Sequence, residues 1–260
     1  MVARIDQRLA AIQKTETVGI LLAVESGSRA WGFPSPDSDY DCRFMFVRSL
    51  SAYLSLFPHR DVIESPLDPV LDVNGWDLAK TLKLLLKGNA VAIEWLTSPY
   101  VYGGDPAFKD ECLALARMIA QRPLIANHYY HLGESIRRKY LQDAKSVRLK
   151  KLFYAVRPAL ALRWLRRHPG ETVPPMNIQA LMSQTELPAS LTHALNQLIV
   201  AKAATREMGV GPAPREIVEF LEAEYALAAS APQQPAPTPQ SHMDAANAFF
   251  QRWVCKPEAA

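Results

Sequence analysis

Three aspartates are notable for their spacing and their surroundings. Asp39 and Asp41 are separated by one residue in "DSDYDCR", where an apolar stretch begins, and Asp72 lies in a second apolar stretch, "VLDVNG". Residues i and i+2 of a β-strand point to the same face, so Asp39 and Asp41 would place two like charges side by side. A divalent cation removes that cost, and Mg²⁺ prefers a few carboxylates together with phosphate oxygens and water. We therefore expect Asp39, Asp41 and Asp72 to hold one or two Mg²⁺ or Mn²⁺ ions.

A turn of small residues precedes the acid pair. Gly27 in "ESGSRAW" lets the backbone approach a phosphate closely, and Ser28 offers a hydroxyl and an N–H group. If Arg29 begins a helical turn, the free N–H groups of that turn face the same anion. Paired metal ions in such a site activate an attacking hydroxyl and neutralise a leaving pyrophosphate. The order of small-residue turn, acid pair and third acid therefore predicts a combined phosphate and metal site.

Each part of this pattern has a simpler explanation when it is taken alone. "GS" occurs in many turns, and Asp37, which follows Pro36, is better explained as a turn residue than as a ligand. The run "DSDYD" lacks the later Gly and Glu of a calcium-binding EF-hand loop. Asp72 alone would most often be a capping or turn acid. The combination, flanked by apolar stretches, is more specific than its parts.

The elements that must position these residues are predicted from apolar periodicity. Alternating or continuous apolar runs predict strands, and residues Tyr40, Cys42, Phe44 and Phe46 should share one strand face, opposite Asp41 and Arg43. The predicted strands cover 17–24, 40–47, 68–73 and 100–104, and the predicted helices of this half cover 3–14, 75–89 and 90–99. From about residue 107 the pattern is helical. We expect an α+β fold, a small mixed sheet backed by helices and followed by an all-helical C-terminal domain.

These patterns suggest boundaries for four segments. We expect a core over 1–106, a helical domain over 107–229, a Pro- and Gln-rich linker over 230–241 and a C-terminal helix over 242–260.

Composition excludes several classes of protein. No apolar run reaches the roughly 18 residues of a membrane span, and the charged N-terminal residues predict no secretion signal. The cysteines Cys42, Cys112 and Cys255 are odd in number and scattered, which predicts a reduced, cytoplasmic chain without a zinc site. The sequence contains neither a GxxxxGK loop nor a readable Ser-His-Asp or Cys-His arrangement. His128, His131 and Glu134 have a helical spacing that suits metal ligands, but pairing of Glu134 with Arg137 or Arg138 explains them better.

Positive charge is concentrated in the helical half. Residues 137–167 contain eleven Lys or Arg and one acid, Asp143, so this stretch carries +10 within a chain of net charge +3. Such asymmetry suggests an anionic ligand, although a solvated helix face is the better explanation when the stretch is taken alone.

The quoted motifs resemble the DNA polymerase beta-like nucleotidyltransferase superfamily. Its pattern is Gly with Gly or Ser, a short gap, Asp-x-Asp on a strand and a third acid on a neighbouring strand, which Gly27-Ser28, Asp39-x-Asp41 and Asp72 match. Residues 20–102 resemble more closely the bacterial and phage RNA-repair-pathway polymerase-beta family of predicted nucleotidyltransferases. A weaker resemblance continues to about residue 180. Cys42 departs from the family, in which an aliphatic residue is more usual near that position.

The resemblance implies a function. It implies Mg²⁺, a nucleoside triphosphate as substrate, transfer of the nucleotidyl group to an acceptor and release of pyrophosphate. RNA is the first candidate for the acceptor, a protein or a small molecule is an alternative, and the nucleotide preference and oligomeric state stay open. A non-catalytic nucleotide- or RNA-binding member of the fold and a toxin–antitoxin or interaction protein are further alternatives.

The resemblance also favours a functional explanation for the basic stretch. On a helix, Lys150, Tyr154 and Arg157 share one face and Lys151 flanks it, so we expect these four residues to hold the triphosphate. Pro158 is predicted to end or kink this helix just after Arg157. The remaining basic residues, 137–139 and 163–167, are expected to hold an anionic acceptor.

Overall fold

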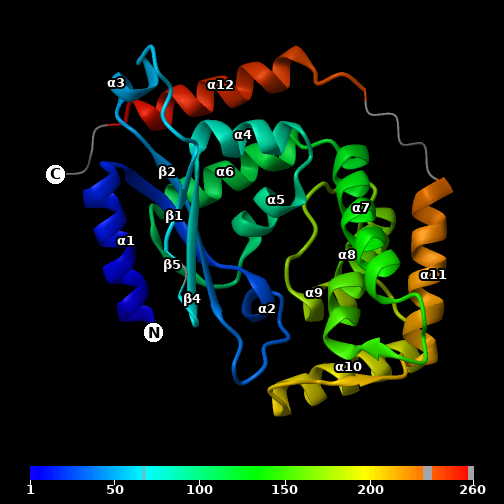
Figure 1. The fold of residues 1–260 in the computed structure, drawn as a ribbon. Coiled ribbons are helices and arrows are strands. Elements are labelled where there is room, and N and C mark those ends of the chain that lie inside the picture. Colours follow the sequence, from blue (N-terminus) through cyan, green and yellow to red (C-terminus); the bar gives the residue numbers. More distant parts are fainter. Residues whose placement is uncertain (67, 231–235, 257–260) are drawn as a thin grey trace. The chain divides into compact units, whose positions relative to one another are not determined.

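The four predicted strands and one strand that was not predicted, β3 Val62–Glu64, form one mixed sheet in the computed structural model, which describes residues 1–66, 68–230 and 236–256 (Figure 1). The strands are β1 Gly19–Glu25, β2 Tyr40–Val47, β3 Val62–Glu64, β4 Leu71–Asp77 and β5 Val101–Gly104. Their order is β3-β4-β2-β1-β5; β2 is parallel to β4, and the other pairings in this sheet are antiparallel. The expected mixed sheet backed by helices is confirmed.

Helices cover both faces of this sheet (Figure 1). The longer helices of this unit are α1 Val2–Glu16, α4 Leu78–Leu86, α5 Ala90–Thr97, α6 Pro106–Ile119 and α12 Gln240–Val254, and α3 Leu50–Tyr53 is a short one. The short helix α2 Gly27–Ala30 begins with the last residue of the chain's first stretch in this unit and continues into the helical unit. Helix α1 packs Ile5, Leu9 and Ile12 into a core that includes Cys42 and Phe44 of β2. Helices α4 and α6 pack on the other side of the sheet, and α12 packs on both of them. The predicted alternation along β2 is therefore confirmed.

The boundary between β4 and α4 lies further along the chain than predicted. A helix was expected from residue 75, but β4 continues to Asp77. A Cβ atom at Gly75 would lie 2.2 Å from the buried ring of Phe44, so the glycine lets β4 pass close to that ring. Asp77 then caps α4, because its Oδ1 accepts a hydrogen bond from the N–H of Ala79 at 2.7 Å.

Helices dominate the rest of the chain, as expected. They are α7 Arg122–Tyr140, α8 Leu149–Arg167, α9 Ile178–Ser183, α10 Ala189–Ala204 and α11 Arg215–Ser230, and the short strands β6 Val147–Arg148 and β7 Val210–Gly211 pair with each other. Helix α8 is central: α7, α9 and α11 all pack on it. The hydroxyl of Tyr225 in α11 donates a hydrogen bond to the carbonyl of Ala155 in α8 at 2.7 Å.

Pro158 does not end helix α8. Of the two predicted effects, an end or a kink, the end is wrong, because α8 continues nine residues further, to Arg167. Proline removes one N–H donor and its ring crowds the carbonyl four residues earlier, and this cost is offset when a helix is packed on several sides. Twelve of the nineteen residues of α8 are buried, Pro158 among them.

The chain forms two compact units whose limits do not coincide with the expected boundaries at residues 106, 229 and 241. The sheet unit comprises the described residues of 1–27, 39–120 and 236–260, and the helical unit comprises those of 28–38 and 121–235. Helices α6 and α12 thus belong with the sheet. Of the expected linker, residues 231–235 lie outside the described residues, and α12 begins at Gln240.

Across the described ranges, no helix has the length and apolar character needed to cross a membrane.

Candidate active site

Two of the predicted metal ligands lie directly opposite each other in the sheet unit. Asp41 of β2 and Asp72 of β4 are register partners across a parallel pairing, which places both side chains on one face. Asp39 precedes them, one residue before the start of β2. Burial is the largest cause of the raised pKa of Asp41; Arg43 opposes it, and the charges of Asp72 and Asp39 add to it. Asp39 and Asp72 therefore both lie close enough to Asp41 to influence its carboxylate.

A second row of side chains, Arg43 and Asn74, supports the first. These two residues are also register partners, each two positions beyond an aspartate. Nη2 of Arg43 donates to Oδ1 of Asp41 at 2.9 Å and to Oδ2 of Asp72 at 2.7 Å, and Nδ2 of Asn74 donates to Oδ1 of Asp72 at 2.7 Å. Neither residue was among the predicted site residues. The strand alternation that placed Arg43 on the face of Asp41 was the signal for it.

The backbone around Asp41 is held by neighbouring groups of β1 and the turn that follows. The N–H of Asp41 donates to Oε1 of Glu25 at 2.9 Å, and its carbonyl accepts from the N–H of Ser26 at 2.8 Å. Glu25 is 1% exposed, and the hydroxyl of Tyr102 also donates to its carboxylate. No local sequence pattern marks this buried glutamate, because its partners come from strands distant in the chain.

Gly27 leaves room beside the Asp41 carboxylate. Its φ is +60°, a left-handed conformation that favours glycine, and a Cβ atom there would lie 2.0 Å from Oδ2 of Asp41. A side chain at this position would therefore clash with Asp41, whereas the expected approach of the Gly27 backbone to a phosphate stays a prediction. Oδ2 is the Asp41 oxygen on the side that Gly27 leaves open.

The residues present have the chemistry of a magnesium site, although they are not arranged around an ion. Within the part of the chain that the structure describes, no group of three or more His, Cys, Asp or Glu side chains is close enough together to hold a metal ion. Asp41 and Asp72 instead share the guanidinium group of Arg43. Carboxylate oxygens are the ligands that Mg²⁺ prefers, and Asp39, Asp41 and Asp72 fit such an ion if this guanidinium moves. Their role as metal ligands stays a prediction.

The predicted phosphate-binding residues Ser28 and Arg29 begin the segment 28–38 of the helical unit. The hydroxyl of Ser28 donates to Oγ of Ser38 at 3.0 Å, and the N–H of Ser35 donates to the same oxygen at 2.8 Å. Nη2 of Arg29 donates to the carbonyl of Ser38 at 2.7 Å. These contacts fix the two ends of the segment to each other, and Asp37 lies in a turn within it, as predicted.

The same segment packs on helix α8 through aromatic side chains. The rings of Phe33 and Phe153 are stacked with centroids 4.5 Å apart, and the ring of Trp31 meets that of Tyr154 edge-on at 5.8 Å. The guanidinium of Arg157 lies 4.5 Å from the Trp31 ring. Two of the predicted site residues, Tyr154 and Arg157, thus contact the same side chain of the segment, that of Trp31.

The predicted cations of α8 differ in exposure. Lys150 is exposed, whereas Arg157 is only 3% exposed. The ammonium group of Lys151 lies 4.7 Å from the ring of Tyr140 and 5.1 Å from that of Tyr154. The guanidinium of Arg157 is therefore much less accessible to a ligand in solution than the ammonium group of Lys150. Triphosphate binding by these residues stays a prediction.

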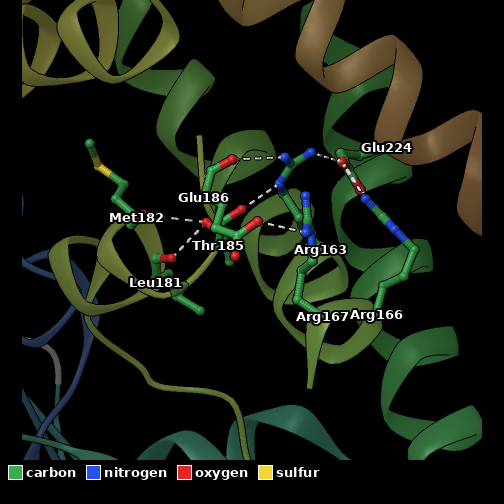
Figure 2. A network of polar contacts seen from close by, with 8 residues as sticks. All are labelled: Arg163, Arg166, Arg167, Leu181, Met182, Thr185, Glu186 and Glu224. Carbon is green, nitrogen blue, oxygen red and sulfur yellow. Dashed lines mark hydrogen bonds and ion pairs between the residues drawn. The ribbon is translucent and has the colours of Figure 1, made fainter. Parts of the chain in front are cut away.

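Several other basic residues of the helical unit have acidic partners (Figure 2). Glu224 is 2% exposed and accepts hydrogen bonds from Arg163 at 2.9 Å and from Arg166 at 2.5 and 2.8 Å. Arg167 pairs with Glu186 at 2.7 Å. These ion pairs give the arginines a structural role, and acceptor binding by them stays a prediction.

Glu134 has the partners that the sequence suggested. Its carboxylate accepts from Nε of Arg137 at 2.6 Å and from Nε of Arg138 at 2.8 Å. The preferred explanation of the His128, His131 and Glu134 spacing, an ion-paired helix surface, is confirmed for the glutamate.

Comparison with known proteins gives two matches. The profile of a family described as "RNA repair pathway DNA polymerase beta family" matches residues 1–252. The "Uncharacterized protein YcgL" of Bacillus subtilis (strain 168) is 38% identical over 224 residues, which cover 86% of this chain and 85% of the relative.

Proposed function

Because the chain belongs to the RNA repair pathway DNA polymerase beta family, we propose that it transfers a nucleoside monophosphate from a nucleoside triphosphate to an acceptor hydroxyl, with an RNA end as the acceptor. In this reaction the acceptor oxygen forms a bond to the α-phosphorus, the bond from that phosphorus to the β-phosphate oxygen breaks, and pyrophosphate leaves. The acceptor proton passes to a base in solution or in the site. The RNA acceptor is supported by the description of the family.

The in-register pair of Asp41 and Asp72 is the observation that carries this proposal. We assign these two residues, with Asp39, to holding a divalent cation. When bound, such an ion supplies neutralising charge at the phosphates and lowers the pKa of a coordinated hydroxyl. Glu25 and Ser26 form hydrogen bonds with the backbone of Asp41 and so hold the backbone from which its side chain extends. The missing side chain of Gly27 leaves that carboxylate accessible.

The cations of α8 are assigned a separate task, binding the triphosphate. Lys150 and Lys151 would contact phosphate oxygens, since ammonium groups act on phosphates as point charges. The buried guanidinium of Arg157 would act through Trp31, by holding the segment that begins with Ser28.

Label transfer tests the proposal. The chain is incubated with each of the four α-³²P-labelled nucleoside triphosphates, in the presence of Mg²⁺ or Mn²⁺ and with RNAs that end in a 3′-hydroxyl or in a 3′-phosphate. We expect label on the hydroxyl-ended RNA, release of pyrophosphate, and no transfer by the Asp41→Asn variant. Total protein and a small-molecule extract serve as further acceptors. Label on the protein or on a small molecule, and none on RNA, would show that RNA is not the acceptor. The absence of label everywhere would refute the transferase proposal.

A further inference from the structure

Arg43 lies where a cation shared by the two central aspartates would be expected. Its Nη2 is 2.9 Å from Oδ1 of Asp41 and 2.7 Å from Oδ2 of Asp72, so one nitrogen bridges the two strands. Nη1 donates to the carbonyl oxygens of Cys42 and Asp72, both at 3.1 Å. The side chain is 17% exposed, compared with 28% for Asp41 and 43% for Asp72. The guanidinium is thus the less exposed partner, held by four hydrogen bonds.

Strand geometry explains this position. Arg43 follows Asp41 by two residues on the same face, about 6.6 Å further along the strand. Its long side chain folds back over that distance to the carboxylates, whereas the shorter Asn74 on β4 reaches only Asp72. Any divalent ion approaching Asp41 and Asp72 meets a positive charge in contact with both.

The hydrogen bonds also occupy most of the carboxylate oxygens. Arg43 and Asn74 together donate to Oδ1 of Asp41 and to both side-chain oxygens of Asp72. Of the four side-chain oxygens of these aspartates, Oδ2 of Asp41, beside Gly27, is the one for which the described residues provide no hydrogen bond. An ion that is to use both aspartates must therefore displace the guanidinium group.

We infer that Arg43 is a resident cation that competes with the divalent metal ion for Asp41 and Asp72. When the positive charge of Arg43 is removed, the negative charges of the two neighbouring carboxylates are no longer neutralised. A metal ion is then attracted by both carboxylates without having to displace the guanidinium group. The competition delays metal binding until another anion accepts the donors of Arg43, and the phosphate oxygens of a triphosphate suit that guanidinium. This last step rests on the proposed function, whereas the competition itself does not.

Direct binding of Mn²⁺ to the full chain tests the competition without any turnover. The free ion is measured by electron paramagnetic resonance, in the absence of nucleotide, for the wild type, Arg43→Met and Arg43→Gln. Two variants are used so that one remains if the other folds poorly, and far-ultraviolet circular dichroism checks each fold. Arg60→Met is the matched control, because Arg60 belongs to the same unit but pairs with Glu64 on the exposed surface.

We expect both Arg43 variants to bind Mn²⁺ at least about tenfold more tightly than the wild type. The control should bind like the wild type, and adding Asp72→Asn to Arg43→Met should cancel the gain. Equal or weaker binding by the Arg43 variants would overturn the inference, since Arg43 would then position the carboxylates for the metal. Undetectable binding in every form would overturn it as well. Tighter binding together with no label transfer to any acceptor would leave the competition standing and refute only the proposed function.

Discussion

Replacing Gly27 by alanine should damage the candidate site more than its backbone strain alone would. A non-glycine residue in the left-handed region costs about 1–2 kcal/mol. The added Cβ would also lie 2.0 Å from Oδ2 and 2.9 Å from Cγ of Asp41, so the carboxylate has to turn away from it. That movement breaks the 2.9 Å ion pair to Arg43, and a hydrogen bond to a charged group contributes about 1.5–3 kcal/mol. The expected loss in the free energy of unfolding is therefore about 2.5–5 kcal/mol.

Gly209 provides the matched control for this substitution. Its φ of +67° is close to the +60° of Gly27, but a Cβ there would have no heavy atom within 4 Å. Gly209→Ala should therefore lose only the strain contribution, about 1–2 kcal/mol. Urea unfolding followed by circular dichroism measures both losses, and Mn²⁺ binding should weaken for Gly27→Ala alone. Equal losses in the two variants, or unchanged Mn²⁺ affinity of Gly27→Ala, would show that the contact with Asp41 does not matter.

Three further predictions concern the rest of the molecule. Glu224→Gln removes the whole negative charge that two arginines share, and should lower the free energy of unfolding by about 3 kcal/mol in urea titrations. A loss below about 1 kcal/mol would mean that the ion pairs of Glu224 in Figure 2 are not formed in solution. Burial is the main reason that the pKa of Lys202 falls from 10.5 to about 8 in the folded chain. Between these two pH values the unfolded chain therefore binds more protons than the folded chain, so the free energy of unfolding should rise with pH, by as much as about 3 kcal/mol. Lys202→Met should flatten that rise, and an unchanged slope of urea midpoint against pH would contradict the assignment. Burial raises the pKa values of Cys42 and Cys112 to about 12, so Ellman's reagent at pH 8 should titrate only the exposed Cys255 in the native chain and three thiols in denaturant.

The features that depend on short-range sequence patterns were predicted well. The limits of β2, residues 40–47, agree with the structure because its alternation of apolar and polar side chains reflects one buried face. Ile5, Leu9 and Ile12 likewise marked the buried side of α1. The pairing of Asp41 with Asp72 was anticipated from their positions on two predicted strands.

The features that depend on contacts between distant residues were missed. Gly75 suggested the start of a helix, and only the ring of Phe44, 31 residues earlier, explains why the strand continues through it. The bridging position of Arg43 depends on the parallel register of β2 and β4, which no local pattern determines. The place of α12 with the sheet unit depends on contacts such as that of Trp253 with Phe108, whose rings meet edge-on at 5.0 Å.

The position of α12 has a consequence for how the protein is made on the ribosome. Phe108 of α6 is fully buried and packs against Phe249 and Trp253 of α12, but about 120 residues separate the two helices in the chain. At synthesis rates of about 5–20 residues per second, α12 emerges roughly 6–24 s after α6. During this interval α6 presents an apolar surface that nothing from its own unit covers. The helical unit, which is synthesised in between, has time to fold first, and nascent chains paused between the two helices should be the form that chaperones bind.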